Sequence, residues 1–263
     1  MKKSEMEKIY NYFKSKNVVS KDVLKDFIED NFPERKRKYI DFYLFDLKNS
    51  EYAYVLNKNI VKISKRIPFK TKKNTTVKEL NNSVIGIIED VNYCIWQKTD
   101  IQNLMRHQFF ENTTYLSVEK NYLENVFIGL KLNDFNISLT SNHMYTELNS
   151  NPIIIENLIN KAPVNRTRKS KIMGNNQNYN NNERIPSPKI EKLLIDFLVD
   201  KKGIYGIDSG ELEEIYRNSL NLYQINIQTL FSYANKRSCK EKLIEYLTNT
   251  IKFDYITGDF IND

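Results

Sequence analysis

The stretch PERKRKYIDFYLFDLKNSEYAYVLNKNIVKIS, residues 33–64, sets the fold expected for the first part of the chain. Proline is favoured at the first turn of a helix, so Pro33 is expected to begin one. Apolar residues then recur at helical spacing, at Ile40, Leu44 and Leu47. Two β-rich runs follow, at 52–56 and 60–63, and the polar residues 57–59 between them indicate a hairpin.

Two further helices are expected before this stretch. Ser4 and Glu7 have the spacing of a capping box ahead of an apolar run, which predicts a first helix ending near residue 16. Ser20 is expected to cap a second helix. Its inward-facing residues would be Val23, Leu24, Phe27 and Ile28. Three helices and a hairpin within residues 1–66 are typical of a winged helix-turn-helix domain, whose third helix enters the major groove of DNA.

In that layout the first residues of the third helix contact bases, and the hairpin lies along the phosphate backbone. The chain has a basic cluster at the start of the expected third helix and lysines in the expected hairpin. The expected DNA-binding residues are Arg35, Lys36, Arg37, Lys38, Tyr43, Lys58, Lys62 and Lys65. The same pattern would also suit a three-helix bundle with a solvated basic face.

Charge along the chain supports a polyanionic partner. The net charge is +7, and residues 1–66 carry sixteen Lys and Arg against ten Asp and Glu. Between Glu51 and Glu79 there is no acidic residue but there are eight basic ones. A localised basic stretch is the electrostatic signature of nucleic-acid binding, so duplex DNA is the expected partner.

Composition excludes several classes of function. The cysteines, Cys94 and Cys239, are too few for a disulfide framework or a structural zinc site, and two histidines offer little for a metal centre. None of the seven glycines lies in a phosphate-binding loop. We therefore expect no cofactor, no metal and no enzymatic activity. Without an apolar run of about 20 residues or the apolar core of a secretory signal, a cytoplasmic protein with no membrane partner is expected.

The rest of the chain predicts a multidomain α+β protein. Residues 77–163 alternate helical and strand patterns, which predicts a mixed α/β domain. Helices are expected at 77–91, 100–105 and 123–132, and strands at 93–96, 115–118, 137–139 and 152–156. A basic, Asn-rich linker at 164–188, a helical domain at 189–250 and a C-terminal arm at 251–263 follow. Caps in the helical domain are expected at Asp208 or Ser209, at Asn226 and at Ser238.

An alternative function is a metal-dependent nuclease in the middle domain. Glu89, Asp90 and Glu119 are its available carboxylates. Glu119 and Lys120 are adjacent, so on a strand their side chains would leave opposite faces, which disfavours this alternative. His107 has no second His or Cys nearby and is expected to be a surface or hydrogen-bonded residue. Cys94 is expected to be an inert core thiol.

A second alternative is an RNA-binding adaptor that uses the basic linker segment at 164–171. The stretch from Tyr223 to Arg237 is the most motif-like part of the chain. Lys236 and Arg237 close a helix there, where the helix dipole favours cations. The dipole accounts for both residues, although contact with an anion or RNA stays open.

Taken together, these patterns resemble the AbiEi family of antitoxins and transcriptional regulators. The resemblance rests on the N-terminal winged helix, on Ile95-Trp96 followed by His107-Gln108 and residues 115–119, and on residues 187–196, 210–212 and 223–237. The motif residues, in a partner-binding or structural role, are Trp96, His107, Glu119, Tyr223, Asn226, Tyr233, Lys236 and Arg237. The hairpin turn departs from the family's Arg-Gly, and Lys236-Arg237 stands in place of a paired Arg-Arg.

The resemblance implies an autorepressor and antitoxin of a type IV toxin–antitoxin system that acts in phage defence. It implies a nucleotidyltransferase-like toxin as functional partner. The family's antitoxins are thought to oppose the effect of the toxin, so direct contact between the two proteins is left open.

Overall fold

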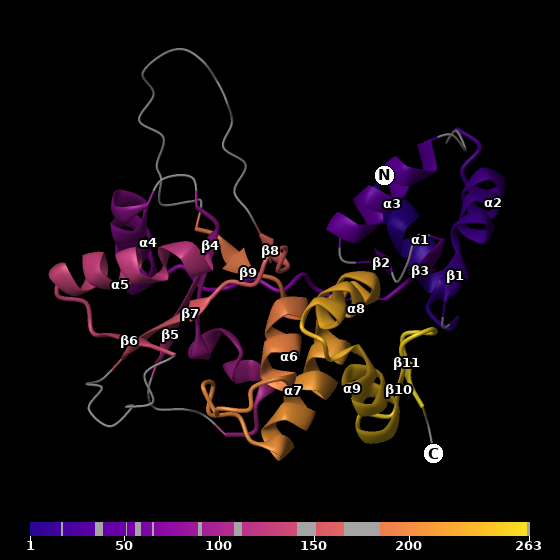
Figure 1. Ribbon diagram of the computed structural model, residues 1–263. Coiled ribbons are helices and arrows are strands. Elements are labelled where there is room, and N and C mark those ends of the chain that lie inside the picture. The colour runs from indigo at the N-terminus through magenta and orange to yellow at the C-terminus, as the bar shows by residue number, and fades with distance from the viewer. Residues whose placement is uncertain are drawn as a thin grey trace, which may run out of the picture. The chain divides into compact units, whose positions relative to one another are not determined.

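The computed structural model describes residues 1–16, 18–34, 39–50, 52–55, 59–64, 66–88, 91–107, 112–140, 151–165 and 185–261. The chain divides into two compact units. The first unit comprises residues 1–69 together with 216–263, and the second unit comprises residues 70–215. Figure 1 shows the elements of each unit.

The N-terminal part of the first unit combines three helices with a small sheet. Its order is α1 (Lys3–Phe13), β1 (Val19–Ser20), α2 (Lys21–Asn31), α3 (Ile40–Asn49), β2 (Tyr54–Val55) and β3 (Ile60–Lys62). The expected hairpin is confirmed, since β2 pairs antiparallel with β3. β1 pairs with the other edge of β3, with Val19 opposite Val61, so the sheet order is β1-β3-β2.

The helix caps in this part agree with the sequence in one case and differ in another. Ser20 caps α2 as expected, and its Oγ accepts from Val23 N at 3.2 Å. The capping box expected at Ser4 and Glu7 is wrong, because α1 begins at Lys3. Lys2 is the cap residue, and its N–H donates to the Glu5 carboxylate at 2.6 Å.

The core of this part is formed by one apolar stripe on each helix and by the inner face of the sheet. Ile9, Phe13, Leu24, Ile28, Leu44, Leu47, Val61 and Ile63 lie in it. Val23 was expected to face inward but is 47% exposed. The other inward positions expected of α2 are buried, because residues three and four apart share a helix face.

The C-terminal part of the first unit holds α8 (Ile227–Lys236), α9 (Lys240–Glu245), a π-helix (Tyr246–Thr250), β10 (Phe253–Asp254) and β11 (Asp259–Phe260). Asn226 caps α8 as expected, through its Oδ1 and Thr229 N at 2.9 Å. The cap expected at Ser238 is wrong, since Cys239 is the cap residue of α9. The tail expected to be an arm is a hairpin, because β10 and β11 pair antiparallel.

A four-stranded mixed sheet organises the second unit. It follows α4 (Thr75–Ile87) and contains β4 (Tyr93–Gln97), β5 (Thr114–Val118), β6 (Ile137–Leu139) and β7 (Ile153–Asn157) in the order β4-β5-β7-β6. β4 is antiparallel to β5, whereas β5, β7 and β6 are parallel. These strands, α4, and α5 (Leu123–Leu132) confirm the expected elements. The helix expected at 100–105 is instead two 3-10 turns.

Both faces of this sheet are covered, because successive side chains of a strand point to opposite faces. One face carries Leu116, Val118 and Ile155, which share a core with residues of α4 and α5. The alternate residues, which include Trp96 and Ser117, meet α6 (Ile190–Leu198) on the other face. The second unit is therefore a sheet between two helical layers (Figure 1).

The observed units differ from the three expected domains. α6 and the first residues of α7 (Ser209–Leu222) lie in the second unit, whereas residues 216–250 belong to the first, so the stretch 189–250 expected to be a helical domain is divided between the two units. The two ends of the expected linker pair as strands, β8 (Val164–Asn165) with β9 (Ser187–Pro188). Residues 166–184 between them lie outside the described residues. Among the described helices, none has the length and apolar character to cross a bilayer.

Candidate functional site

Most of the residues expected to bind DNA lie outside the described part of the chain. They are Arg35, Lys36, Arg37, Lys38, Lys58 and Lys65. The structure does describe the helix that directly follows the first four, α3, and the strand that follows Lys58, β3.

Tyr43 does not face a groove as expected. Its side chain is 8% exposed and lies in the core of the N-terminal helices. The helical spacing gives the reason, since Tyr43 and Leu47 are four residues apart and share the buried stripe of α3.

Lys62 was expected on the phosphate-binding face, and this prediction is also wrong. Its Nζ donates to both carboxylate oxygens of Asp259 in β11, each at 2.6 Å, and its side chain is buried. Arg66 is buried nearby in sequence and donates to the carbonyl of Gly258 at 3.4 Å. Two residues of the basic stretch therefore fasten the C-terminal hairpin of the first unit.

The described surface of α3 is aromatic rather than cationic. Phe42 and Phe45 are 67% and 61% exposed, and the ring of Tyr39 meets that of Phe42 edge-on at 6.1 Å. Asp41 is exposed on the same helix and pairs with Lys21. The described side chains of α3 therefore offer no cation to a phosphate.

Trp96 lies in an aromatic cluster of the second unit. Its ring stacks on Tyr115 with the centroids 4.4 Å apart and the planes 13° from parallel. Phe197 and Tyr205 complete the cluster, and all four side chains are buried. Burial on this scale is typical of a core, so the structural role expected for Trp96 is the one that its surroundings favour.

Beside the aromatic cluster lies a buried group of polar side chains, here called the ionic cluster. It comprises Lys192 and Asp196 of α6, Ser117 of β5, Glu156 of β7 and Tyr205. Lys192 Nζ donates to Asp196 Oδ2 at 2.8 Å and to Glu156 Oε1 and Ser117 Oγ at 3.2 Å. Ser117 Oγ and Tyr205 OH donate to the two oxygens of Glu156 at 2.5 and 2.6 Å.

The ionic cluster shifts the pKa values of its members. Burial would raise the pKa of Glu156, but the charge of Lys192 and the hydrogen bonds from Ser117 and Tyr205 lower it below its ordinary value. Burial and the charge of Glu156 raise the pKa of Tyr205 well above its ordinary value. Burial also raises the pKa of neighbouring Cys94 to about 11, and the side chain lies in the core, as the sequence predicted.

Sequence reasoning missed the ionic cluster, although one signal was present. Residues 190–198 are apolar around most of the helix, and a helix that is hydrophobic on all sides is a buried one. Lys192 and Asp196, four residues apart in such a helix, had to pair in the interior. Their partners on β5 and β7 have no local signature.

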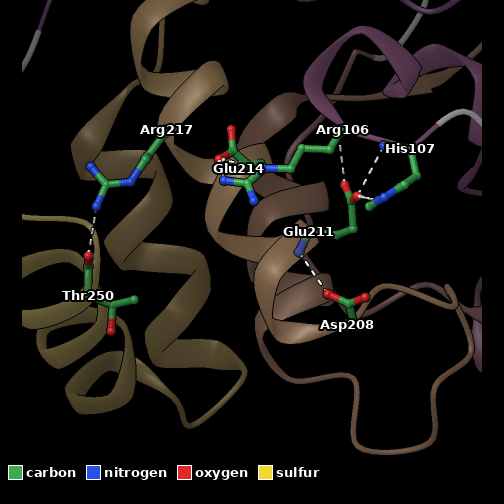
Figure 2. Close-up of polar contacts among 7 residues, drawn as sticks. All are labelled: Arg106, His107, Asp208, Glu211, Glu214, Arg217 and Thr250. Carbon is green, nitrogen blue, oxygen red and sulfur yellow. Dashed lines mark hydrogen bonds and ion pairs between the residues drawn. The ribbon is translucent and has the colours of Figure 1, made fainter.

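His107 contacts Glu211, which belongs to the motif at residues 210–212. Its Nδ1 lies 2.5 Å from Glu211 Oε1 of α7, and Arg106 N and His107 N donate to the same carboxylate at 3.1 Å (Figure 2). Arg106 also forms an ion pair with Glu214. The imidazole is exposed, as expected, whereas Glu211 is buried.

Glu211 has the geometry of a clamp between the 105–107 turn and α7. Asp208 Oδ1 accepts from Glu211 N at 2.8 Å and so caps this helix, as the sequence predicted (Figure 2). One buried carboxylate thus satisfies two backbone donors of the turn and orients the His107 ring.

The C-terminal motif residues occupy mainly structural positions. Tyr223 is buried against Phe69 and bridges to Ile67. Tyr233 is 2% exposed. Lys236 is exposed at the end of α8, and Arg237 Nη1 approaches the Tyr233 hydroxyl at 3.5 Å. Among these motif residues, Lys236 is the one with an exposed side chain.

The nuclease alternative gains no support from the described residues. Glu119 accepts a hydrogen bond from the Asn92 amide, and Glu89 and Asp90 lie outside the described residues. The part of the chain that the structure describes has no group of three or more His, Cys, Asp or Glu side chains able to hold a metal ion.

The fold and these sites define a mixed α/β protein of two units in which buried polar clusters join helices to a sheet. The chain belongs to DUF6577, a family of unknown function, whose model matches residues 39–252. The match runs from the residue before α3 to the second residue after the π-helix, so α1 and α2 precede it. A comparison with curated proteins gave no match.

Proposed function

We propose that this protein binds duplex DNA as a transcriptional regulator, with the N-terminal part of the first unit as a winged helix-turn-helix. The observation that carries the proposal is the element order α1-β1-α2-α3-β2-β3 with the sheet order β1-β3-β2. In this arrangement α3 is the recognition helix and the β2–β3 hairpin is the wing.

Position in the sequence supports the assignment of contacts. Arg35, Lys36, Arg37 and Lys38 directly precede α3, where recognition helices contact DNA, and Lys58 lies between the strands of the wing. Tyr43 and Lys62 are excluded from the interface by their burial. The proposed contacts are Arg35, Lys36, Arg37, Lys38, Lys58 and Lys65.

The binding experiment measures the affinity of the full chain for its own upstream DNA over a range of salt concentrations. Each phosphate contact contributes about 0.9 to the slope of log affinity against log salt. A variant with Arg35→Ala, Arg37→Ala and Lys38→Ala should bind more weakly, and its slope should fall by up to about 2.7 if all three contact phosphates. The full chain is needed because residues 216–263 belong to the same unit as residues 1–69.

A matched control removes three exposed lysines elsewhere, Lys201→Ala, Lys202→Ala and Lys240→Ala, for the same change in net charge. This control should keep the affinity and slope of the natural chain at moderate salt. Equal weakening of both variants, or no weakening of the first, would contradict the proposed interface.

The further role, as an antitoxin that opposes a nucleotidyltransferase-like toxin, rests on the AbiEi resemblance. Its test is growth rescue in cells that express the neighbouring gene together with this chain from an unrelated promoter. We expect the full chain to rescue growth, and the variant with three substitutions at residues 35, 37 and 38 to rescue it equally while losing repression. A chain that binds DNA but gives no rescue would leave a regulator without antitoxin activity.

A further inference from the structure

A pocket of about 350 Å³ opens in the second unit at the carboxyl ends of β5 and β7. Val118 and Asn157 are paired at the ends of these two parallel strands, and Leu158 N donates to Val118 O at 2.7 Å just beyond them. The residues that follow both strands, 119–121 and 158–162, line the pocket together with Asn92.

The topology explains why the sheet is open at this point. β5 leads into α5, which covers the face that carries Leu116 and Val118. The chain after β7 leads to α6, which contacts Ser117 and Glu156 on the opposite face. Helices on opposite faces thus flank the ends of β5 and β7, and open α/β sheets bind ligands in crevices outside the carboxyl ends of their strands.

Most of the lining residues are polar and carry both signs of charge, while Leu158, Ile159 and Ala162 supply an apolar part. Carboxamides come from Asn92, Asn121, Asn157 and Asn160. Glu119 supplies a carboxylate that is held by a hydrogen bond from Asn92. Lys120 and Lys161 supply ammonium groups, and both side chains belong to exposed residues.

One wall of the pocket is a turn with an unusual backbone. Ala162 N donates to Ile159 O at 3.0 Å, and Lys161 within this turn has φ of +59°. Residues other than glycine adopt this left-handed conformation rarely, and such residues concentrate at binding sites. The turn fixes Asn160 and Lys161 beside the ends of the strands.

The chemistry of this lining selects a class of ligand. Carboxamides and a carboxylate bind hydroxyl groups, since they offer donors and acceptors together, while two lysines favour an anionic group. Among the residues that the structure describes, no aromatic side chain lines the pocket, so a nucleobase would lack a stacking partner there. We propose that this pocket binds a small phosphorylated sugar, with its phosphate at Lys120 and Lys161 and its hydroxyls at the asparagines and Glu119.

Isothermal titration calorimetry of the full chain tests the site with ribose 5-phosphate and glucose 6-phosphate as probes. At least one of them should bind saturably. Ribose, glucose and inorganic phosphate should each bind at least about tenfold more weakly, because each lacks one half of the recognised chemistry.

The test variant combines Lys120→Gln with Lys161→Asn, since asparagine tolerates the left-handed conformation of residue 161. It should weaken sugar-phosphate binding at least about tenfold. The control, Lys201→Gln with Lys202→Gln, removes two exposed lysines of the same unit outside the pocket and should bind like the natural chain.

Three results would overturn the site: no binding of either probe, equal binding of inorganic phosphate, or unchanged affinity in the Lys120 and Lys161 variant. A short single-stranded oligonucleotide that displaces the sugar phosphate at lower concentration would assign the pocket to nucleic acid instead. DNA binding through residues 35–38 is measured separately, so either proposal can fail while the other stands.

Discussion

Lys192 in the second unit and Lys62 in the first unit are both buried, but their surroundings differ. Lys192 contacts two carboxylates and a hydroxyl, and all of these groups are buried with it. Lys62 forms an ion pair with Asp259, and that carboxylate is 30% exposed. Lys192 joins α6 to two strands of the sheet in the second unit. Lys62 joins the C-terminal hairpin to the small sheet of the first unit, where the ion pair is partly exposed to solvent.

A count of charges along a sequence therefore does not give the charge of a surface. Both lysines would count toward a basic face, yet neither can meet a phosphate. An isolated ammonium group is costly to bury, so each must be matched by a carboxylate. The more completely the partners are buried, the more stability should be lost when the lysine is removed.

The largest expected effect is that of Lys192→Met. This change leaves Glu156 and Asp196 buried without their cation, which should destabilise the second unit by about 3–5 kcal/mol. Amide hydrogen exchange measures the loss of stability separately for each segment, and faster exchange is expected in β5, β7 and α6. Adding Glu156→Gln and Asp196→Asn should restore much of the protection, and a loss below about 1 kcal/mol in the single variant would contradict the role of Lys192.

A second prediction uses the pKa of Glu156, which the fold lowers. Its carboxylate therefore stabilises the folded state above the unfolded pKa of about 4.3, and this contribution is lost as the pH falls through the lower folded value. The natural chain should exceed Glu156→Gln in stability at neutral pH, and the difference should shrink in acid. The readout is hydrogen exchange of β7 across pH, with rates corrected for intrinsic exchange. A stability difference between the two chains that stays constant across pH would show that ionisation of Glu156 does not contribute to stability.

Lys62→Met should have a smaller effect, about 1–2 kcal/mol, because solvent already screens part of the ion pair. Faster exchange is expected in β10 and β11, with little change in the sheet of the second unit. Asp259→Asn is the matched change on the other partner and should give a loss of similar size. Unchanged protection of residues 253–261 in both variants would show that the pair does not hold the hairpin.

The smallest expected effect is the response to salt. Raising the salt concentration shortens the screening length to about 3 Å at 1 M, which weakens exposed pairs and leaves buried ones largely intact. The contribution of Lys62 and Asp259 should fall by roughly 0.5 kcal/mol, whereas that of Lys192 should stay nearly constant. Repeating the exchange measurements on the natural chain and both lysine variants at two salt concentrations tests this, and equal responses would remove the distinction between the two lysines.

Local patterns predicted most of the elements. The strand at 115–118, the helix at 123–132 and the caps at Ser20 and Asn226 follow from alternation, helical spacing and side-chain capping, which depend on neighbours in sequence. Where the prediction failed locally, at Ser4 and at Ser238, a cap residue a few positions away or adjacent was used instead.

The features that could not be predicted from the sequence depend on contacts between residues far apart along the chain. The C-terminal hairpin is held by Lys62, almost two hundred residues earlier, and residues 216–263 belong to the same unit as residues 1–69. The ionic cluster needs Ser117 and Glu156 beside Lys192, and the pocket needs the ends of two strands brought together by the sheet order. None of these partners can be identified from spacing along the chain.

The stacked pair of Trp96 and Tyr115 makes the second unit optically distinct. Trp96 is the single tryptophan of the chain, and it lies buried among other aromatic rings in that unit. Emission excited at the red edge of indole absorption therefore reports on residues 70–215 alone, while circular dichroism follows helices of both units. A melting curve recorded by both signals in one sample would show directly whether the two units unfold together or in succession.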